Sequence, residues 1–495
     1  MERRNDQKAI TFFRGDTIET ELTFGQLREH ADNFAGYLST FGISKGERII
    51  LLLEKSLMFI TAHIAIQQLG AISVPLNPGF KKRELQYLLN DAAPQLVITE
   101  PEKAALICTI DPDVRIIEIS TLAPYQTHHF LHIKTSQYAM PDLSLDDPAL
   151  IIYTSGTTGD PKGAVLTQKN LMHDAGNIIR IWEITEKDVL CHALPLFHVH
   201  GLCFALHTAL LSGAHVSMLD RFDPKLVLTM LSSKDPGTAC TVFMAVPAMY
   251  TKIMDEMGDQ HLKFKHTRLL ASGSAPLLVQ EFARIQTLFD IQPVEREGMS
   301  ETGMNFSNPL KDRKKPGSIG KPLPGLAVRI VDPGTLQDVA TGQIGEIWLK
   351  GPGITPGYWQ KPEETQNAFK FGWFRTGDLG KVDEDGYYFL TDRIKHIIIT
   401  GGENVSAKEV ETIINQMDPI LESSVVGIPD AKWGETVVAA VVTHLKADVD
   451  AQQIIAFCKE HLHDWKCPKQ VRFIDELPRN SMGKILTEAV KKLFI

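Results

Sequence analysis

The run TSGTTGDPKG, residues 154–163, has residue types and a spacing that could do chemistry. It packs four hydroxyl side chains, three glycines and a lysine into one stretch. Glycines let backbone N–H groups come close to an anion, hydroxyls donate further hydrogen bonds, and Lys162 adds a mobile positive charge. The run therefore predicts a loop that grips the phosphates of a nucleoside triphosphate.

Two other interpretations of this run have to be weighed. A Walker A loop requires a lysine followed by Ser or Thr, whereas here Pro161 precedes Lys162 and Gly163 follows it. A flexible linker is the second alternative, because Ser, Thr and Gly also fill linkers. The flanking sequence favours a nucleotide loop: ALIIYTSG predicts a buried strand, and GAVLTQKNLMHDAGNIIRIW predicts a strand and then a helix with Thr167 as N-cap.

The elements that position this loop follow an α/β pattern. Helical patterns alternate with short apolar runs, which predicts β-α units around largely parallel sheets. In the first cycle the expected helices are 22–42, 56–71 and 82–92, and the expected strands are 48–53, 72–76 and 95–99. In a second cycle, from about 149 to 309, the expected strands are 215–220, 240–246 and 267–274. The two cycles predict two α/β lobes.

The pattern changes after Gly317, where Gly and Pro become frequent and 326–332 and 345–351 look like hairpin strands of a small β-rich lobe. In a final stretch, apolar runs and helical patterns alternate again, at 423–430, 436–445, 451–462 and 469–478. We therefore expect an α/β protein with a large N-terminal domain, 1–394, of two α/β lobes plus a β-rich lobe, and a small C-terminal α/β domain, 395–495. The boundary is expected after a strand that ends at Leu390.

Composition narrows the class of protein. The 495 residues carry a net charge of -9, which disfavours nucleic acid as the main partner. The N-terminal MERRNDQKAITFF lacks the apolar core of a signal peptide, and no segment predicts a transmembrane helix, so we expect a cytoplasmic protein. Six cysteines without CxxC spacing predict reduced thiols. Five histidines between 192 and 215 have no carboxylate among them, so we expect no transition-metal site there.

Four motifs occur in order: TSGTTGDPKG at 154–163, GMSETG at 298–303, RTGDLG at 375–380 and PRNSMGK at 478–484. Together they resemble the adenylate-forming superfamily of acyl-CoA synthetases, nonribosomal-peptide adenylation domains and luciferases. The resemblance spans most of the chain. It implies that ATP, Mg²⁺ and coenzyme A are used to join a carboxylic acid to CoA in two steps, through an acyl-adenylate, with release of pyrophosphate and AMP.

That reaction brings two anions together, so cations and fixed donors must offset the charge. The resemblance assigns Mg²⁺ to Glu301, the α-phosphate to Ser300, and the bridging of acid and nucleotide to Lys484. The nucleotide contacts it implies are Thr154, Ser155, Gly156, Thr157, Thr158, Gly159, Lys162, Gly273, Ser274, Ala275, Asp378 and Arg393. Structural alternatives are a capping serine for Ser300, a hinge-region salt bridge for Arg393 and a surface lysine for Lys484.

The thioester step implies a mobile C-terminal domain. The resemblance puts the hinge at Lys395 and brings Gly401 and Gly402 near the pantetheine of CoA, where an ordinary linker turn is the alternative. Two residues depart from the family pattern: Glu297 stands where an aromatic residue usually stacks on adenine, and Ala407 stands where proline is common.

For the acid, the wider segments around these motifs look most like malonyl-CoA synthetases. Arg296, which the resemblance places near the acyl group, could pair with the distal carboxylate of a dicarboxylic acid, and His198 would line the same region. Arg296 could instead pair with Glu295 or Glu297. A fatty or aryl acid is the alternative substrate, a carrier protein is the alternative acceptor, and a nucleotide-binding regulator is the non-enzymatic alternative.

Overall fold

The fold is described from a computed structural model, which covers residues 4–133, 140–154, 161–258, 260, 262–400, 403–430, 432–444, 448–480 and 485–495. The chain forms two compact units. Unit 1 consists of Met1–Gly317, Pro322–Ala327 and Lys350–Gly372, and unit 2 of Ser318–Lys321, Val328–Leu349 and Trp373–Ile495. The chain passes between the units more than once, so the expected division at 394/395 stays a prediction.

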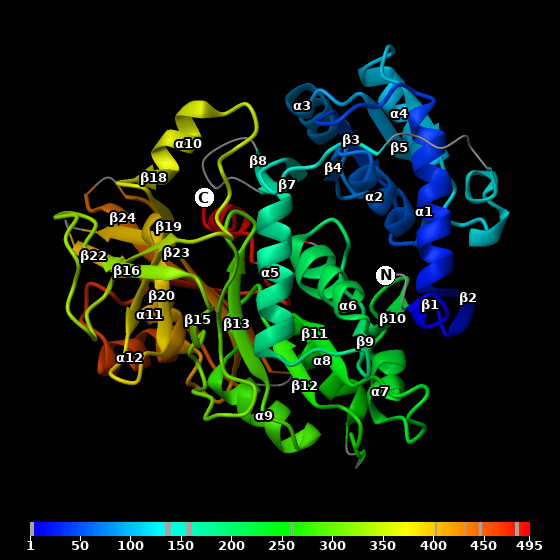
Figure 1. Ribbon diagram of the computed structural model, residues 1–495. Helices are drawn as coiled ribbons and strands as arrows, with labels where there is room; N and C mark the ends of the chain where they lie inside the picture. Colours follow the sequence, from blue (N-terminus) through cyan, green and yellow to red (C-terminus); the bar gives the residue numbers. More distant parts are fainter. Residues whose placement is uncertain are drawn as a thin grey trace. The chain divides into compact units, whose positions relative to one another are not determined.

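The first lobe of unit 1 contains a six-stranded sheet (Figure 1). Its order is β6 (Ile116–Glu118), β5 (Leu96–Thr99), β3 (Arg48–Leu52), β4 (Ile72–Pro75), β7 (Pro148–Thr154) and β8 (Lys162–Thr167). The pairs are parallel except for β7 with β8. Alternate residues of β3 lie in two different hydrophobic cores, Ile49 and Leu51 in one and Ile50 and Leu52 in the other. Burial on both faces explains why these strands are continuous apolar runs.

The helices of this lobe begin where local sequence predicts. Thr23 caps the first of them through a capping box with Gln26, and Figure 1 shows α1 running beside α2. The helices are α1 (Phe24–Ser39), α2 (Leu57–Gln68), α3 (Lys82–Ala92) and α4 (Pro101–Ile110), followed by the short 3₁₀ turns Tyr125–Thr127 and His129–Leu131.

The second lobe of unit 1 is built on a longer, mainly parallel sheet. Its order is β14 (Gly303–Ser307), β13 (Val294–Met299), β12 (Leu269–Ser272), β11 (Val242–Ala245), β9 (Val189–His192), β10 (His215–Leu219), β1 (Lys8–Arg14) and β2 (Thr17–Thr23). Its helices are α5 (Gln168–Ile181), a π-helix (His200–His207), α6 (Thr208–Ser212), α7 (Pro224–Ser232), α8 (Pro247–Met257) and α9 (Val279–Phe289). The short elements β15 (Lys321–Pro322), α10 (Pro362–Ala368) and β18 (Phe369–Lys370) follow later in the chain.

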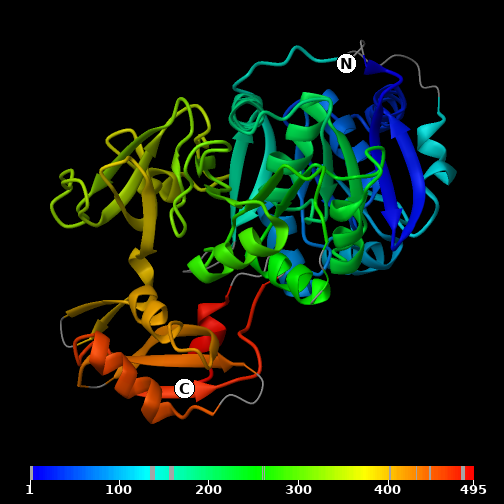
Figure 2. The ribbon, with the colours of Figure 1, turned by 90° about the horizontal axis from the view of Figure 1, so that it is seen from below.

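Unit 2 contains two further sheets, drawn yellow and orange in Figure 2. The first is formed by β16 (Ala327–Val331), β17 (Gly345–Lys350), β19 (Trp373–Val382) and β20 (Tyr388–Arg393). The second has the order β22 (Glu403–Ser406), β21 (Ile397–Thr400), β24 (Gly434–Thr443) and β23 (Ile420–Asp430), with β25 (Gln470–Phe473) beside β24. The helices are α11 (Ala407–Ile414), α12 (Ala451–His461) and α13 (Thr487–Lys491), and a 3₁₀ turn spans Ile394–His396.

The expected α/β class and the two α/β lobes are confirmed, and Thr167 caps α5 as predicted by accepting a hydrogen bond from the Asn170 N–H. The prediction that a strand ends at Leu390 is wrong. Strand β20 continues to Arg393, which pairs with Asp378 of β19. The N-terminal hairpin of β1 and β2 was not expected. It completes the second lobe because β1 pairs in parallel with β10.

Among the described residues, no helix combines the length and the apolar character that a membrane crossing needs. All six cysteines are free thiols. Cys108 is exposed and the other five are buried.

Candidate active site

The two ends of the predicted phosphate loop are held by paired strands. Thr154, at the end of β7, pairs with Lys162, at the start of β8, and the Thr154 hydroxyl donates to the Lys162 carbonyl at 3.3 Å. The Tyr87 hydroxyl on α3 donates to the Pro161 carbonyl at 2.9 Å. The hydroxyls and glycines between them, namely Ser155, Gly156, Thr157, Thr158 and Gly159, lie outside the described residues.

A segment far along the chain runs beside this loop, and we call residues 355–361 the strap. Its Trp359 N–H donates to the Gly163 carbonyl at 2.7 Å. The Val165 N–H in turn donates to the Gly357 carbonyl at 3.0 Å. These bonds extend β8 by a short antiparallel pairing, so the strap has a definite position next to the phosphate loop.

The strap also reaches Glu301, the predicted Mg²⁺ residue. The Thr355 N–H donates to the Glu301 carbonyl at 2.7 Å, and the Tyr358 hydroxyl donates to Glu301 Oε1 at 3.1 Å. Lys162 Nζ lies 5.5 Å from the centroid of the Tyr358 ring. Through the strap, unit 1 brings together Lys162 and Glu301, which are far apart in the sequence. Ser300, beside Glu301, is partly buried.

The electrostatics of this region suit a metal–phosphate complex. Glu301 is 8% exposed, and burial together with the neighbouring carboxylate raises the pKa of Tyr358, so its hydroxyl remains a donor. No group of three or more His, Cys, Asp or Glu that could hold a metal occurs in the described part of the chain. Mg²⁺ is commonly bound by one or two carboxylates plus phosphates and water, so a single Glu301 fits that mode and does not fit a metal cage of protein ligands alone.

Arg296, on β13, has different surroundings. Its side chain is 3% exposed, its guanidinium carbon lies 5.1 Å from the centroid of the Phe204 ring, and a Cβ at Gly273 would stand 2.5 Å from its Nε. None of its three guanidinium nitrogens has a hydrogen-bond partner among the described residues, so it is hydrogen-bonded to neither Glu295 nor Glu297. Burial lowers its pKa to about 10, while the negative charges of Glu297 and Asp174 act in the opposite direction, and the group stays charged at neutral pH. The alternative of a charge interaction with Glu297 therefore stays open.

His200, whose ring feels the charge of Arg296, is also buried, and its Nε2 has no partner in the described structure. His200 Nδ1 lies 3.1 Å from the hydroxyl of Ser274. Burial, with the Arg296 charge nearby, holds the pKa of His200 well below its usual range, so the ring is neutral. With the serine as donor, the ring carries its proton on Nε2 and can donate to an anion.

Two carboxyl groups of the same lobe are also buried, and the Arg296 charge acts on one of them, Asp174. Burial raises the pKa of Asp174 to about 7, and this carboxyl accepts from the Met304 N–H at 2.8 Å. Burial raises the pKa of Glu295 to about 8, and Glu295 accepts from the Leu277 N–H at 3.3 Å. Leu277 follows Gly273, Ser274 and Ala275, which were predicted to contact the nucleotide. His198 is half-buried, and burial lowers its pKa to about 4.

Two of the predicted nucleotide contacts, Asp378 and Arg393, belong to unit 2. Asp378 is 6% exposed, and Arg393 Nε lies 2.6 Å from Asp378 Oδ1. This is the salt bridge that was considered as an alternative for Arg393. Lys395 lies in the 3₁₀ turn Ile394–His396, and its side chain is outside the description. Gly401, Gly402 and Lys484 also lie outside the described residues, so their predicted roles stay predictions.

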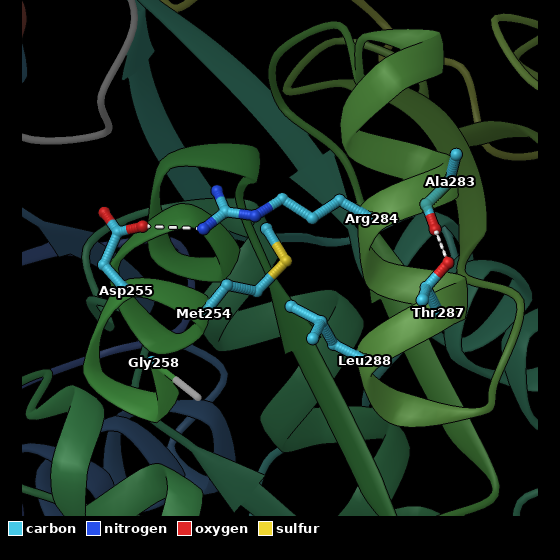
Figure 3. A pocket seen from close by; sticks show the side chains of 7 residues that line it. All are labelled: Met254, Asp255, Gly258, Ala283, Arg284, Thr287 and Leu288. Carbon is cyan, nitrogen blue, oxygen red and sulfur yellow. Dashed lines mark hydrogen bonds and ion pairs between the residues drawn. The ribbon is translucent and has the colours of Figure 1, made fainter. Parts of the chain in front are cut away.

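An open groove of about 650 Å³ lies between α8 and α9 (Figure 3). It is lined by Met254, Asp255, Gly258, Ala283, Arg284, Thr287 and Leu288. Arg284 crosses it to Asp255 at 2.9 Å. No predicted site residue lines it, so it is separate from the candidate site.

Sequence reasoning missed the strap. The only local signal was an aromatic pair, Tyr358 and Trp359, in a segment otherwise typical of turns, TPGYWQKP. Such a segment predicts a loop, and nothing in it points to Lys162 or Glu301.

The chain is similar in sequence and in fold to several CoA ligases and CoA synthetases. The chain is 34% identical over 478 residues to the mitochondrial malonate–CoA ligase of Bos taurus, covering 90% of this chain and 81% of that protein. It is 31% identical to a long-chain-fatty-acid–CoA ligase of Bacillus subtilis, covering 97% and 90%. ATP-bound MatB from Rhodopseudomonas palustris superposes with a TM-score of 0.92 at 35% identity, covering 100% and 97%. O-succinylbenzoate CoA synthetase (MenE) from Bacillus subtilis, in complex with ATP and magnesium, gives 0.85 at 27%, covering 98% and 96%.

The family models agree with these similarities over almost the whole chain. The model of the AMP-binding enzyme matches residues 1–359, and the model of the AMP-binding enzyme C-terminal domain matches residues 409–484. The chain belongs to the AMP-binding enzyme family.

Proposed function

We propose that the protein activates malonate or a similar short dicarboxylic acid and transfers it to coenzyme A. The enzyme class is an AMP-forming acid–thiol ligase. In the first step one carboxylate attacks the α-phosphorus of ATP, giving acyl-AMP and pyrophosphate. In the second step the thiolate of CoA attacks the acyl carbon, giving acyl-CoA and AMP.

The observation that carries the dicarboxylate is the buried guanidinium of Arg296, whose nitrogens have no hydrogen-bond partner among the described residues. Burying the donors of a charged group without hydrogen bonds is costly, and an anion that accepts from them reduces the cost. In a dicarboxylic acid, one carboxylate reacts with ATP and the other stays free to bind Arg296. A fatty or aryl acid has no second carboxylate for this contact. His200 Nε2 supplies a neutral donor beside the same charge. Arg296 and His200 together can bind a carboxylate at two points.

ATP and Mg²⁺ are proposed on the phosphate side. Lys162 and the loop 154–163 would bind the phosphates, Ser300 the α-phosphate, and Glu301 a Mg²⁺ that reduces the repulsion between ATP and the attacking carboxylate. The similarity to structures with bound ATP and magnesium supports this assignment. The proposed roles in unit 2 are ribose binding by Asp378 and Arg393, and orientation of the acid by Lys484. Lys395 is proposed as the hinge at the 394/395 boundary, and Gly401 and Gly402 as contacts of CoA.

A Lys484→Ala variant tests the catalytic lysine. We expect AMP formation to fall strongly, while release of AMP from a supplied acyl-adenylate by CoA continues. Retention of full adenylation would remove Lys484 from the first step.

The test of the whole proposal is an acid panel: malonate, methylmalonate, acetate, octanoate, palmitate and a cinnamic acid, each with ATP, Mg²⁺ and free CoA. We expect AMP and acyl-CoA from malonate, with much less from the monocarboxylic acids. Preference for octanoate or a cinnamate would favour the alternative of a fatty or aryl acid ligase, which the Bacillus subtilis relative also supports. Adenylate without any CoA thioester would favour loading of a carrier protein.

We also propose the cytoplasmic location that was expected from the sequence. Cell fractionation with an antibody against the protein tests it.

A further inference from the structure

We propose that Tyr358 is a positioning residue for the nucleotide step, holding the Glu301 carboxylate and the Lys162 ammonium in place before ATP and Mg²⁺ bind. The inference rests on the proposed function, because it uses the roles proposed there for Lys162 and Glu301. No motif of the sequence pointed to Tyr358.

The first half of the role is the hydrogen bond from the Tyr358 hydroxyl to Glu301 Oε1, at 3.1 Å. Glu301 is 8% exposed, so few water molecules can orient its carboxylate. A carboxylate has about four lone-pair sites, so one donor can fix its rotation and leave room for a metal ion.

The second half is the contact between the Tyr358 ring and Lys162, whose Nζ lies 5.5 Å from the ring centroid. The face of an aromatic ring attracts a cation electrostatically. It does so without the directional lone pairs of an oxygen acceptor, so the N–H donors of the lysine can still turn toward phosphate oxygens. One side chain thus restrains an anion through its hydroxyl and a cation through its ring.

Tyr358 can do this because its own backbone is fixed. The hydrogen bonds at Gly357 and Trp359 flank it, and the strap ends at an ion pair between Lys361 Nζ and Asp91 Oδ1, at 2.8 Å. Asp91 is 7% exposed in its side chain and also accepts from the Tyr153 hydroxyl at 2.8 Å. The strap is therefore anchored on both sides of Tyr358 within unit 1.

Two variants separate the two halves of the role. Tyr358→Phe removes the hydrogen bond to Glu301 and keeps the ring under Lys162, whereas Tyr358→Leu removes both. The dissociation constant of ATP is measured by calorimetry with Mg²⁺ and with EDTA, and the Mg²⁺ concentration for half-maximal AMP formation is measured alongside.

For Tyr358→Phe we expect the Mg²⁺ requirement to rise about tenfold, because the variant loses one hydrogen bond to a charged group. ATP binding in EDTA should not change. For Tyr358→Leu we expect ATP binding in EDTA to weaken by a further factor of about two to five, the size of an exposed cation–π contact.

Tyr125→Phe is the matched control. It also removes one buried tyrosine hydroxyl of unit 1, which bonds to His30 Nδ1 at 3.0 Å and Thr61 Oγ1 at 2.8 Å. This control should change thermal stability and leave the Mg²⁺ requirement as in the wild type.

An unchanged Mg²⁺ requirement in Tyr358→Phe would overturn the inference while leaving the proposed function intact. A wild type that neither binds ATP nor forms AMP would instead overturn the proposed function. If Tyr358→Leu fails to fold, Tyr358→Phe is combined with Glu301→Gln. Tyr358→Phe should then have no further effect on the Mg²⁺ dependence of ATP binding, and an additive effect would contradict a role that acts through Glu301.

Discussion

Two regions of unit 1, around Glu301 and around Arg296, differ in whether the protein supplies hydrogen bonds to their charged side chains. Around Glu301, the strap supplies a hydrogen bond to the carboxylate and an aromatic face to Lys162. Around Arg296, a guanidinium that is 3% exposed has no hydrogen-bond partner in the described structure. On the proposed function, the protein arranges the phosphate side in advance, since every reaction uses the same nucleotide. The proposed acid side would leave hydrogen bonds of its guanidinium for the substrate to make, and this difference would make it selective.

The largest effect that tests this comparison is expected at Glu301. Glu301→Gln keeps the side-chain volume and an acceptor for the Tyr358 hydroxyl, but it removes the negative charge that would bind Mg²⁺. We expect the rate of AMP formation to fall by about a hundred- to a thousandfold, as for loss of a main electrostatic contact in an active site. The measurement is pyrophosphate release with saturating ATP. A fall of less than threefold would contradict the proposed metal role.

Arg296→Met should have a smaller effect on activity, and this effect should be limited to the use of the acid substrate. We expect kcat/KM for malonate to fall by about a hundredfold, because the variant lacks the guanidinium that would pair with the distal carboxylate of malonate. The free energy of unfolding should fall little, because the substitution breaks no hydrogen bond of the guanidinium among the described residues.

Arg268→Met is the matched control for that variant. Arg268 binds both oxygens of Asp188, through Nε and Nη2 at 2.7 Å each, and the Asp188 side chain is 5% exposed. Removing this partner should lower the free energy of unfolding by about 3 kcal/mol and leave the preference among acids unchanged. Equal stability losses in the two arginine variants would show that Arg296 has a structural partner after all.

The pH dependence of stability sharpens the comparison on the acid side. The pKa of Asp174 is raised by burial from 3.8 to about 7, so between these values the folded protein keeps a proton that the unfolded chain releases. This site therefore stabilises the fold less as the pH rises from about 4 to about 7, by at most about 1.4 kcal/mol per pH unit. Asp174→Asn should remove that slope while keeping the bond from the Met304 N–H. Denaturant unfolding of both proteins at several pH values measures the difference, and parallel curves would contradict the raised pKa.

The smallest expected effect is in the strap itself. The Thr355 hydroxyl, in a residue 2% exposed, lies 2.5 Å from the Val165 carbonyl and 2.9 Å from the Gly357 carbonyl. Thr355→Val should lower the free energy of unfolding by about 1 kcal/mol, the net value of a hydrogen bond. Thr355→Ser keeps the hydroxyl and should lose less. If the two variants are equally stable, the hydroxyl does not hold the strap.

Much of the fold could be predicted because its signals are local. The cap at Thr167 needs only the residues that follow it, and apolar runs such as Ile72–Pro75 are continuous because both faces of the strand are buried. The hairpin of β1 and β2 could not be placed. Its partner β10 begins about two hundred residues later, and no feature of either strand specifies the other.

For the candidate site, the sequence by itself determined the residue types: hydroxyls, glycines and a lysine at 154–163, a glutamate at 301, and an arginine at 296 in a chain of the AMP-binding enzyme family. Only the tertiary structure decided which charges are paired. Arg296 stands between two glutamates in the sequence, yet it is hydrogen-bonded to neither and lies against Phe204 and Gly273. Tyr358 lies in a segment typical of turns, yet pairing with β8 brings it to Lys162 and Glu301. Charge pairing depends on distances of a few ångströms between remote segments, and a local pattern of residues does not encode those distances.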